Sequence, residues 1–116
     1  HNSGKSKRMF EIENCIKHIQ SLFPNQPVRV VSFQGLLTDF CASQGGSFII
    51  RGLRDTKDFE FEKSLATMNH DLSGIETLFL LTGKSHSAIN ASMVREIHMN
   101  GGDITLFVTN AHELIT

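Results

Sequence analysis

The chain has 116 residues, of which 40% are hydrophobic and 20% charged, and its formal net charge is −1. This length suits one domain, residues 1–116, and the composition is that of an ordinary soluble globular protein. A near-neutral chain lacks the basic excess of a general nucleic-acid surface, and no apolar run reaches the roughly 18 residues of a membrane span. Two cysteines are too few for a disulfide framework and fit a cytoplasmic protein.

The predicted elements alternate between helix and strand. Apolar residues at helical spacing predict the helices, short β-branched or apolar runs predict the strands, and paired glycines such as Gly45-Gly46 end a helix. In chain order, the pattern predicts helix 9–23, strand 28–33, helix 34–44, strand 47–50, helix 55–72, strand 76–81, helix 91–100 and a short helical segment over 104–116.

The predicted strands are continuous apolar runs rather than alternating ones. Such strands are typical of a parallel sheet covered on both faces by crossover helices, so the expected fold is α/β and Rossmann-like. Ligands of these sheets bind at the carboxyl ends of the strands. The candidate binding loops are therefore 32–35, 51–58 and 82–92.

The loop after strand 47–50 carries two arginines, Arg51 and Arg54, around Gly52. A glycine lets the backbone approach a ligand closely, a helix start favours anions, and two guanidinium groups suit phosphate oxygens. The loop therefore predicts a nucleotide phosphate site. In the alternative interpretation the arginines form a solvated ion network with the carboxylates that follow, Asp55, Asp58 and Glu62.

The loop before helix 91–100 offers Ser87, Asn90 and Ser92, which could bind a second anion or simply cap the helix. None of the six histidines stands at metal-ligand spacing, so no protein-held metal is expected. No pairing of a nucleophile with a base is recognisable either, and a covalent mechanism has no support.

Four runs together resemble one family: "IIRGLRDTKDFEFE", "LATMNHDL", "IETLFLL" and "SAINASMVREIHMNGGDITLFV". They are similar to phosphopantetheine adenylyltransferase, a bacterial nucleotidyltransferase family of coenzyme A biosynthesis, and the match covers nearly the whole chain. The resemblance implies transfer of AMP from ATP to 4′-phosphopantetheine, giving dephospho-CoA and pyrophosphate. It also implies a Rossmann-like fold, Mg²⁺ with ATP, CoA as a further ligand, and a cytoplasmic homo-hexamer.

Matching the motifs residue by residue assigns Lys5, Leu37 and Arg51 to the phosphopantetheine side, with Lys7 as the rival of Lys5. The resemblance assigns the ATP side to Gly52, Leu53, Arg54, Glu62, His86, Ser87, Ala88, Ile89, Asn90, Ala91 and Ser92. For Glu62, binding of the ribose and orientation of Arg54 are both open. The family's "SFISSS" is "SAINAS" here, so backbone amides would replace some hydroxyl donors.

The family begins with a strand, a Thr-Asn-Gly-His loop, a helix and a second strand that have no match in this chain. The resemblance therefore places the catalytic histidine in that unmatched segment and implies that the chain as given is inactive. In the family's strand order, 3-2-1-4-5, the unmatched strands are the middle of the sheet. We therefore expect 28–33 to be unpaired with 47–50, and a direct ladder between them would contradict this interpretation.

Two other functions stay open. One is a related nucleotidyltransferase that acts on nicotinamide mononucleotide, or on a phospho-alcohol with CTP. The other is a non-catalytic nucleotide-binding or oligomerisation module, which the unmatched histidine motif favours.

Overall fold

A computed structural model describes residues 9–83 and 89–115. The chain divides into two compact units: a strand unit, Gly35–Ala88, and a helical unit made of His1–Gln34 and Ile89–Thr116. The expectation of a single domain stays a prediction. Among the residues that the structure describes, no helix is long and apolar enough to cross a bilayer.

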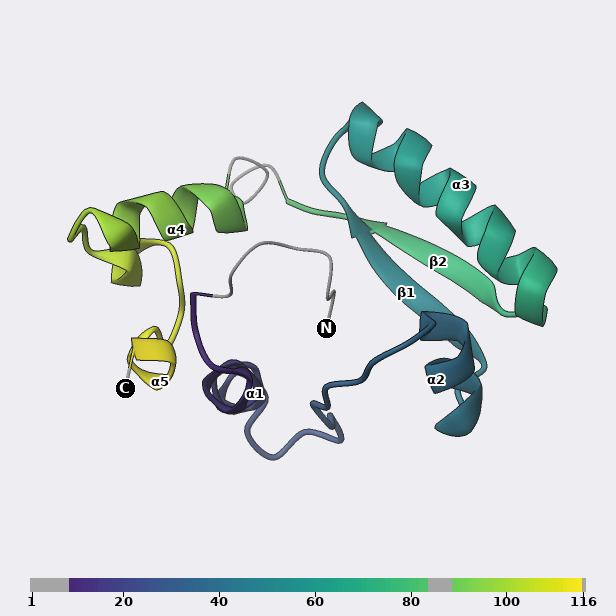
Figure 1. The fold of residues 1–116 in the computed structure, drawn as a ribbon, viewed down its shortest axis with the longest axis horizontal. Helices are drawn as coiled ribbons and strands as arrows, with labels where there is room; N and C mark the ends of the chain where they lie inside the picture. Colours follow the sequence, from purple (N-terminus) through teal and green to yellow (C-terminus); the bar gives the residue numbers. More distant parts are fainter. Residues whose placement is uncertain (1–8, 84–88, 116) are drawn as a thin grey trace. The chain divides into compact units, whose positions relative to one another are not determined.

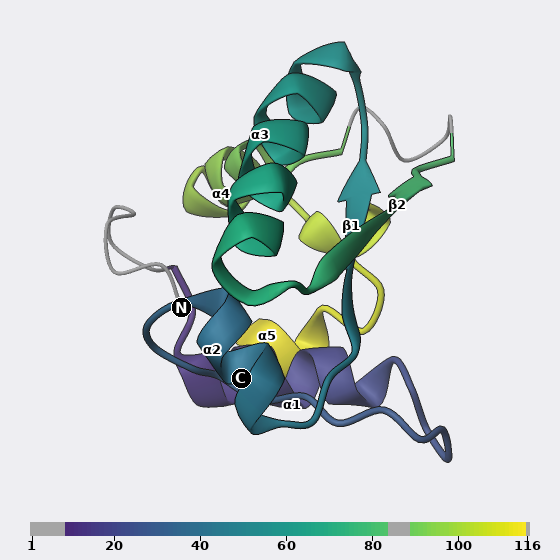
Figure 2. The same ribbon diagram turned by 90° about the vertical axis from the view of Figure 1, so that its right-hand side faces the viewer.

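The strand unit contains α2 (Leu37–Ser43), β1 (Phe48–Leu53), α3 (Thr56–Ser73) and β2 (Glu76–Leu81). The two strands are parallel and pair in register from Phe48 opposite Glu76 to Leu53 opposite Leu81. Helix α3 is the crossover that joins them, and it runs beside the sheet in both ribbon views (Figures 1 and 2). This β-α-β arrangement confirms the predicted α/β class with parallel strands.

The two faces of this small sheet differ in how far their side chains are exposed. Ile49 and Leu53 point to the face on the α3 side and are only 8% and 6% exposed. Side chains of the alternate positions, Phe48, Ile50, Leu78 and Leu80, are all at least half exposed. The described elements of the strand unit therefore leave the second face of the sheet without the cover that the sequence predicts.

Helix α3 begins and ends where its sequence has strong capping residues. Asp55 precedes it, and its carboxylate accepts a hydrogen bond from the backbone N–H of Asp58 at 2.8 Å. Gly74 follows it with a φ of 73°, a left-handed conformation that glycine adopts without a Cβ penalty. These caps fix the register of α3 and hence the side chains that it presents to the end of β1.

The helical unit contains α1 (Ile12–Ser21), α4 (Ala91–Met99), the short 3-10 helix η2 (Ile104–Leu106) and α5 (His112–Ile115). Helices α1 and α5 pack side by side, and both are visible in Figure 2. The Asn14 amide donates to the Leu114 carbonyl at 3.4 Å, and His18 Nε2 lies 2.6 Å from the Thr109 carbonyl. The predicted segment 104–116 is thus two short helices, separated at Asn110 with its φ of 55°.

The predicted strand 28–33 is wrong, because these residues lie in no strand of the structure. The side chain of Gln20 instead takes the place of a partner strand. Its amide donates to the Val28 carbonyl at 3.0 Å, and its oxygen accepts from the Val30 N–H at 3.1 Å. The only described sheet consists of β1 and β2, so 28–33 does not pair with β1, as expected. A strand needs a neighbouring ladder, and 28–33 pairs with no strand of the described sheet.

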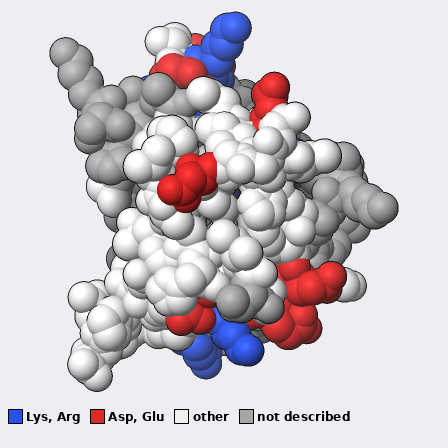
Figure 3. Space-filling model, turned by 90° about the vertical axis from the view of Figure 1, so that its left-hand side faces the viewer, with Lys and Arg blue, Asp and Glu red and all other residues white. Residues whose placement is uncertain are grey.

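Figure 3 shows one face of the molecule as a space-filling view. Most described side chains on this face are uncharged, and acidic and basic ones are dispersed among them.

Candidate active site

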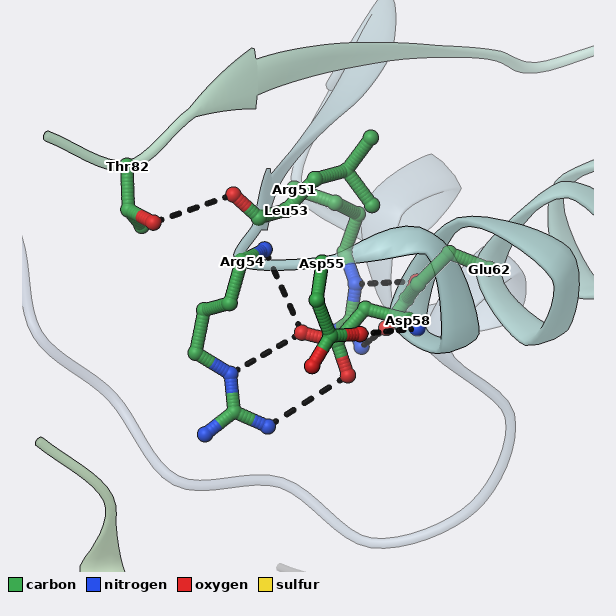
Figure 4. A network of polar contacts seen from close by, with 7 residues as sticks. All are labelled: Arg51, Leu53, Arg54, Asp55, Asp58, Glu62 and Thr82. Atoms are coloured by element: carbon green, nitrogen blue, oxygen red, sulfur yellow. Dashed lines mark hydrogen bonds and ion pairs between the residues drawn. The ribbon is translucent and has the colours of Figure 1, made fainter. Parts of the chain in front are cut away.

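The predicted strand 47–50 continues to Leu53, so Arg51 lies in β1 and not in a loop, and a carboxylate from the neighbouring helix holds it. Its Nη2 lies 2.6 Å from Glu62 Oε1 and its Nε lies 3.0 Å from Glu62 Oε2, a bidentate pair between β1 and α3 (Figure 4). The Arg51 side chain is 41% exposed and that of Glu62 only 13%. The hydrogen bond that Arg51 donates to Glu62 raises the pKa of Arg51 against the opposing effect of partial burial.

The second arginine, Arg54, forms a different pair. Its Nε lies 2.9 Å from Asp58 Oδ2 and its Nη2 3.3 Å from Asp58 Oδ1, and its backbone N–H also donates to Asp58. This pair is local, four residues apart, and lies at the start of α3 (Figure 4). The hydrogen bond from the Arg54 side chain lowers the pKa of Asp58 below its ordinary value. The ion network of the alternative interpretation is therefore present, with one carboxylate for each arginine.

Between the arginines, Gly52 and Leu53 complete β1. The Leu53 carbonyl accepts from the N–H of Thr82 at 2.9 Å and from its hydroxyl at 3.1 Å, so Thr82 extends the strand pairing past the end of β2 (Figure 4). A Cβ placed on Gly52 would meet only Thr82 Cγ2, at 3.9 Å. Gly52 thus leaves room for the close approach of a ligand, and nothing within the described chain requires a glycine there.

A small hollow of about 10 Å³ brings three of the predicted residues together: Leu37, Arg51 and Glu62. Sequence reasoning took them from three separate segments, and they meet because α2, β1 and α3 converge on the same face of the sheet. The other lining residues are Ile49, Leu65, Ala66, Asn69 and Thr77.

Sequence reasoning missed two polar residues of this hollow, Asn69 and Thr77. Asn69 stands seven residues after Glu62, which is two helical turns, so helical spacing alone could have placed it on the same face. Thr77 is a polar interruption of the apolar run of β2. Its buried hydroxyl has no hydrogen-bond partner in the described part of the chain.

The remaining predicted site residues fall outside this hollow. Lys5, its rival Lys7, and His86, Ser87 and Ala88 lie outside the described residues. In the helical unit, the side chain of Asn90 accepts from the backbone N–H of Met93 at 3.0 Å and caps α4. Capping is therefore what the structure shows for Asn90, and the assignment of Ile89, Asn90, Ala91 and Ser92 to ATP stays a prediction.

No group of three or more His, Cys, Asp or Glu side chains that could hold a metal ion occurs within residues 9–83 and 89–115. The acidic side chains beside the arginines, Asp58 and Glu62, are each bonded to a guanidinium group. The described residues therefore do not fit a metal site built by the protein alone.

Comparison with known proteins finds relatives that all carry one family name. No protein-family model matches the chain. A phosphopantetheine adenylyltransferase of Flavobacterium psychrophilum is 46% identical over 110 residues, which cover 94% of this chain and 73% of that protein. One from Flavobacterium johnsoniae is 42% identical over 94% of this chain and 72% of its own length. One from Streptomyces coelicolor is 42% identical over 88% of this chain and 65% of its own length.

The chain belongs to the phosphopantetheine adenylyltransferase family. This confirms the family that the motifs around Arg51 and Glu62 indicate, and with it the class of nucleotidyltransferases. In the structure, Arg51, Gly52 and Leu53 form the carboxyl-terminal half of β1, and parallel α/β sheets commonly bind ligands at that end of their strands.

Proposed function

We propose that this protein transfers the adenylyl group of ATP to 4′-phosphopantetheine, giving dephospho-CoA and pyrophosphate in coenzyme A biosynthesis. A phosphate oxygen of the acceptor attacks the α-phosphorus of ATP, and the bond from that phosphorus to the departing pyrophosphate breaks. The observation that carries the proposal is the Arg51-Gly52-Leu53-Arg54 run at the end of β1 in a chain of this family.

In this proposal the described residues position substrates and neutralise charge, which is most of what catalysis of phosphoryl transfer requires. Arg51 binds the acceptor phosphate, and Leu37, which lines the same hollow, contacts the acceptor. Arg54, with the open backbone at Gly52 and Leu53, binds the phosphates of ATP. In the same proposal, Ile89 to Ser92 contact ATP and Lys5 contacts the acceptor.

Other expectations of the resemblance remain proposals of the same kind. They are Mg²⁺ brought by ATP, binding of CoA, a homo-hexamer and a cytoplasmic location. Mg²⁺ would supply charge neutralisation on the polyphosphate.

The test is the formation of ATP from dephospho-CoA and pyrophosphate, measured with this chain and with the full gene product in parallel. Turnover by the gene product with these substrates, and not with nicotinamide mononucleotide or with CTP and a phospho-alcohol, is the expected result. A folded gene product that binds CoA but turns over neither pair would overturn the proposal in favour of a binding module.

A further inference from the structure

We infer that Thr82 is a positioning residue for the ATP side of the reaction, because it fixes the peptide unit from which Arg54 leaves β1. The inference rests on the proposed function, in which Arg54 binds the phosphates of ATP. Thr82 follows the last residue of β2, and the resemblance assigns it no role. Its contact with the carbonyl of Leu53 is drawn in Figure 4.

The carbonyl oxygen of Leu53 accepts two hydrogen bonds from Thr82. The backbone nitrogen of Thr82 lies 2.9 Å from this oxygen, and the hydroxyl oxygen of Thr82 lies 3.1 Å from it. A carbonyl oxygen has two lone pairs, so both are used. Leu53 and Leu81 are the last paired residues of the β1–β2 ladder, and strand ends open more readily than strand centres. The hydroxyl therefore adds a second hydrogen bond at the point where the ladder ends.

The peptide unit that Thr82 holds also carries the N–H of Arg54. A peptide unit is planar, and in the trans form its C=O and N–H groups point in opposite directions. With the Leu53 carbonyl directed at Thr82, the Arg54 N–H points the other way and donates to Asp58 Oδ2 at 3.2 Å. Because the Cα of Arg54 belongs to the same rigid unit, the point from which the Arg54 side chain departs is fixed as well.

The methyl group of Thr82 lies on the side of Gly52 where a side chain would stand. A Cβ built at Gly52 would meet Thr82 Cγ2 at 3.9 Å. The hydroxyl at the Leu53 carbonyl and the methyl group beside Gly52 together hold Thr82 at one χ1 angle, a torsion that β-branching already restricts. Thr82 therefore borders the open backbone that the proposed function assigns to ATP.

Arg54 is held less firmly by its carboxylate partner than Arg51 is by its own. Asp58 is only four residues from Arg54, and the side chains of this pair are 26% and 43% exposed, so the pair contributes little to the position of the strand end. Arg51 lies within the ladder and pairs with Glu62 from α3. We therefore expect loss of the Thr82 hydroxyl to affect the ATP side and to leave the acceptor side unchanged.

The decisive experiment compares Thr82→Val with the unchanged full gene product in steady-state kinetics, with each substrate varied in turn. Valine keeps the β-branched shape and the backbone N–H, and it removes only the hydroxyl. We expect KM for ATP to rise about threefold to fivefold, while KM for 4′-phosphopantetheine stays within about twofold. Thr82→Ser restores the hydroxyl and should return KM for ATP to the unchanged level. Thr82→Ala removes the same hydroxyl and supplies the measurement if the valine variant does not fold.

Thr67→Val is the matched control. The hydroxyl of Thr67 also donates to a backbone carbonyl, that of Lys63 at 2.9 Å, but it does so on the exposed side of α3. Since the two valine variants lose the same kind of hydrogen bond, an effect on stability alone would appear in both, and only Thr82→Val should change KM for ATP. In an Arg54→Ala background, Thr82→Val should add little further rise in KM for ATP, because the side chain that it positions is gone.

Several outcomes would overturn the inference. An unchanged KM for ATP in both Thr82→Val and Thr82→Ala would show that the hydroxyl does not serve the ATP side, and so would an equal rise in both KM values. A Thr82→Ser protein as impaired as Thr82→Val, or fully additive losses in the double variant, would overturn it as well. An unchanged gene product without any turnover would overturn the proposed function, and this inference would fall with it.

Discussion

Replacing Thr77 by valine should make the protein more stable, although it removes a hydrogen-bonding group. The hydroxyl of Thr77 is buried beside the hollow that Arg51 and Glu62 line, and it has no partner among the described residues. In the unfolded chain this hydroxyl is bonded to water, so folding removes a hydrogen bond and restores none. Thr77→Val keeps the β-branched shape that suits a strand and deletes only the group that loses its partner.

The size of the effect follows from the cost of an unpaired polar group. Burying a hydroxyl without a hydrogen bond costs about 1–3 kcal/mol in proteins. Relaxation of neighbouring side chains reduces this, so we expect the free energy of unfolding to rise by about 1 kcal/mol. The melting temperature should rise by about 4 °C.

Equilibrium unfolding in urea measures this change directly. The control is Thr67→Val, where the hydroxyl lies on the exposed side of α3 and donates to the Lys63 carbonyl at 2.9 Å, and its effect should stay within about 0.5 kcal/mol. A Thr77→Val protein that is less stable by about 1 kcal/mol would refute the reasoning. It would show that the hydroxyl has a partner, such as one water molecule, for which a hollow of about 10 Å³ is just large enough.

Three further predictions concern the start and end of α3. Arg54→Ala should raise KM for ATP while the melting temperature hardly changes, because the Arg54–Asp58 pair is exposed. A higher KM together with a comparably large fall in melting temperature would favour a purely structural ion pair. Since the pKa of Asp58 is lowered from 3.8 on folding, its contribution to stability is present above that pH and is lost as pH falls through the lowered value. Asp58→Asn should therefore make the free energy of unfolding depend less on pH in the acid range. An unchanged dependence on pH would contradict the Arg54–Asp58 pairing. Gly74→Ala should cost about 1 kcal/mol in urea unfolding, since alanine is strained at a φ of 73°; no loss would mean that this helix end can rearrange.

The sequence was most informative where local signals and long-range packing agree. The apolar spacing of α3, the capping candidates of α4 and the run from Glu76 to Leu81 place these elements within a residue or two of their observed bounds. Residues 28–33 show the opposite case. Their β-branched composition favours a strand, but a strand also needs a partner, and composition carries no information on whether one is present.

The candidate site was predictable in its residues and less so in its contacts. Motif matching selected Leu37, Arg51 and Glu62, which the structure brings to one hollow. Spacing could not decide which arginine pairs with which carboxylate, because Asp58 and Glu62 are one helical turn apart and both follow the loop closely. The direction of β1 and the start of α3 decide it, and both are properties of the folded backbone.

The two arginine pairs suit the two ends of the proposed reaction. Arg54 and Asp58 form an exposed pair within one turn, and such pairs contribute little net free energy, so a phosphate can replace Asp58 and leave again at small cost. That is what binding of a polyphosphate that must depart as pyrophosphate requires. Arg51 and Glu62 form a half-buried pair that joins a strand to a helix, and exchange of either partner is costly. A guanidinium group held in this way suits the acceptor phosphate, whose attacking oxygen must be directed at one phosphorus atom. In the proposed reaction, the different roles of the two arginines therefore follow from where their carboxylates lie, one on the first turn of α3 and the other on its second.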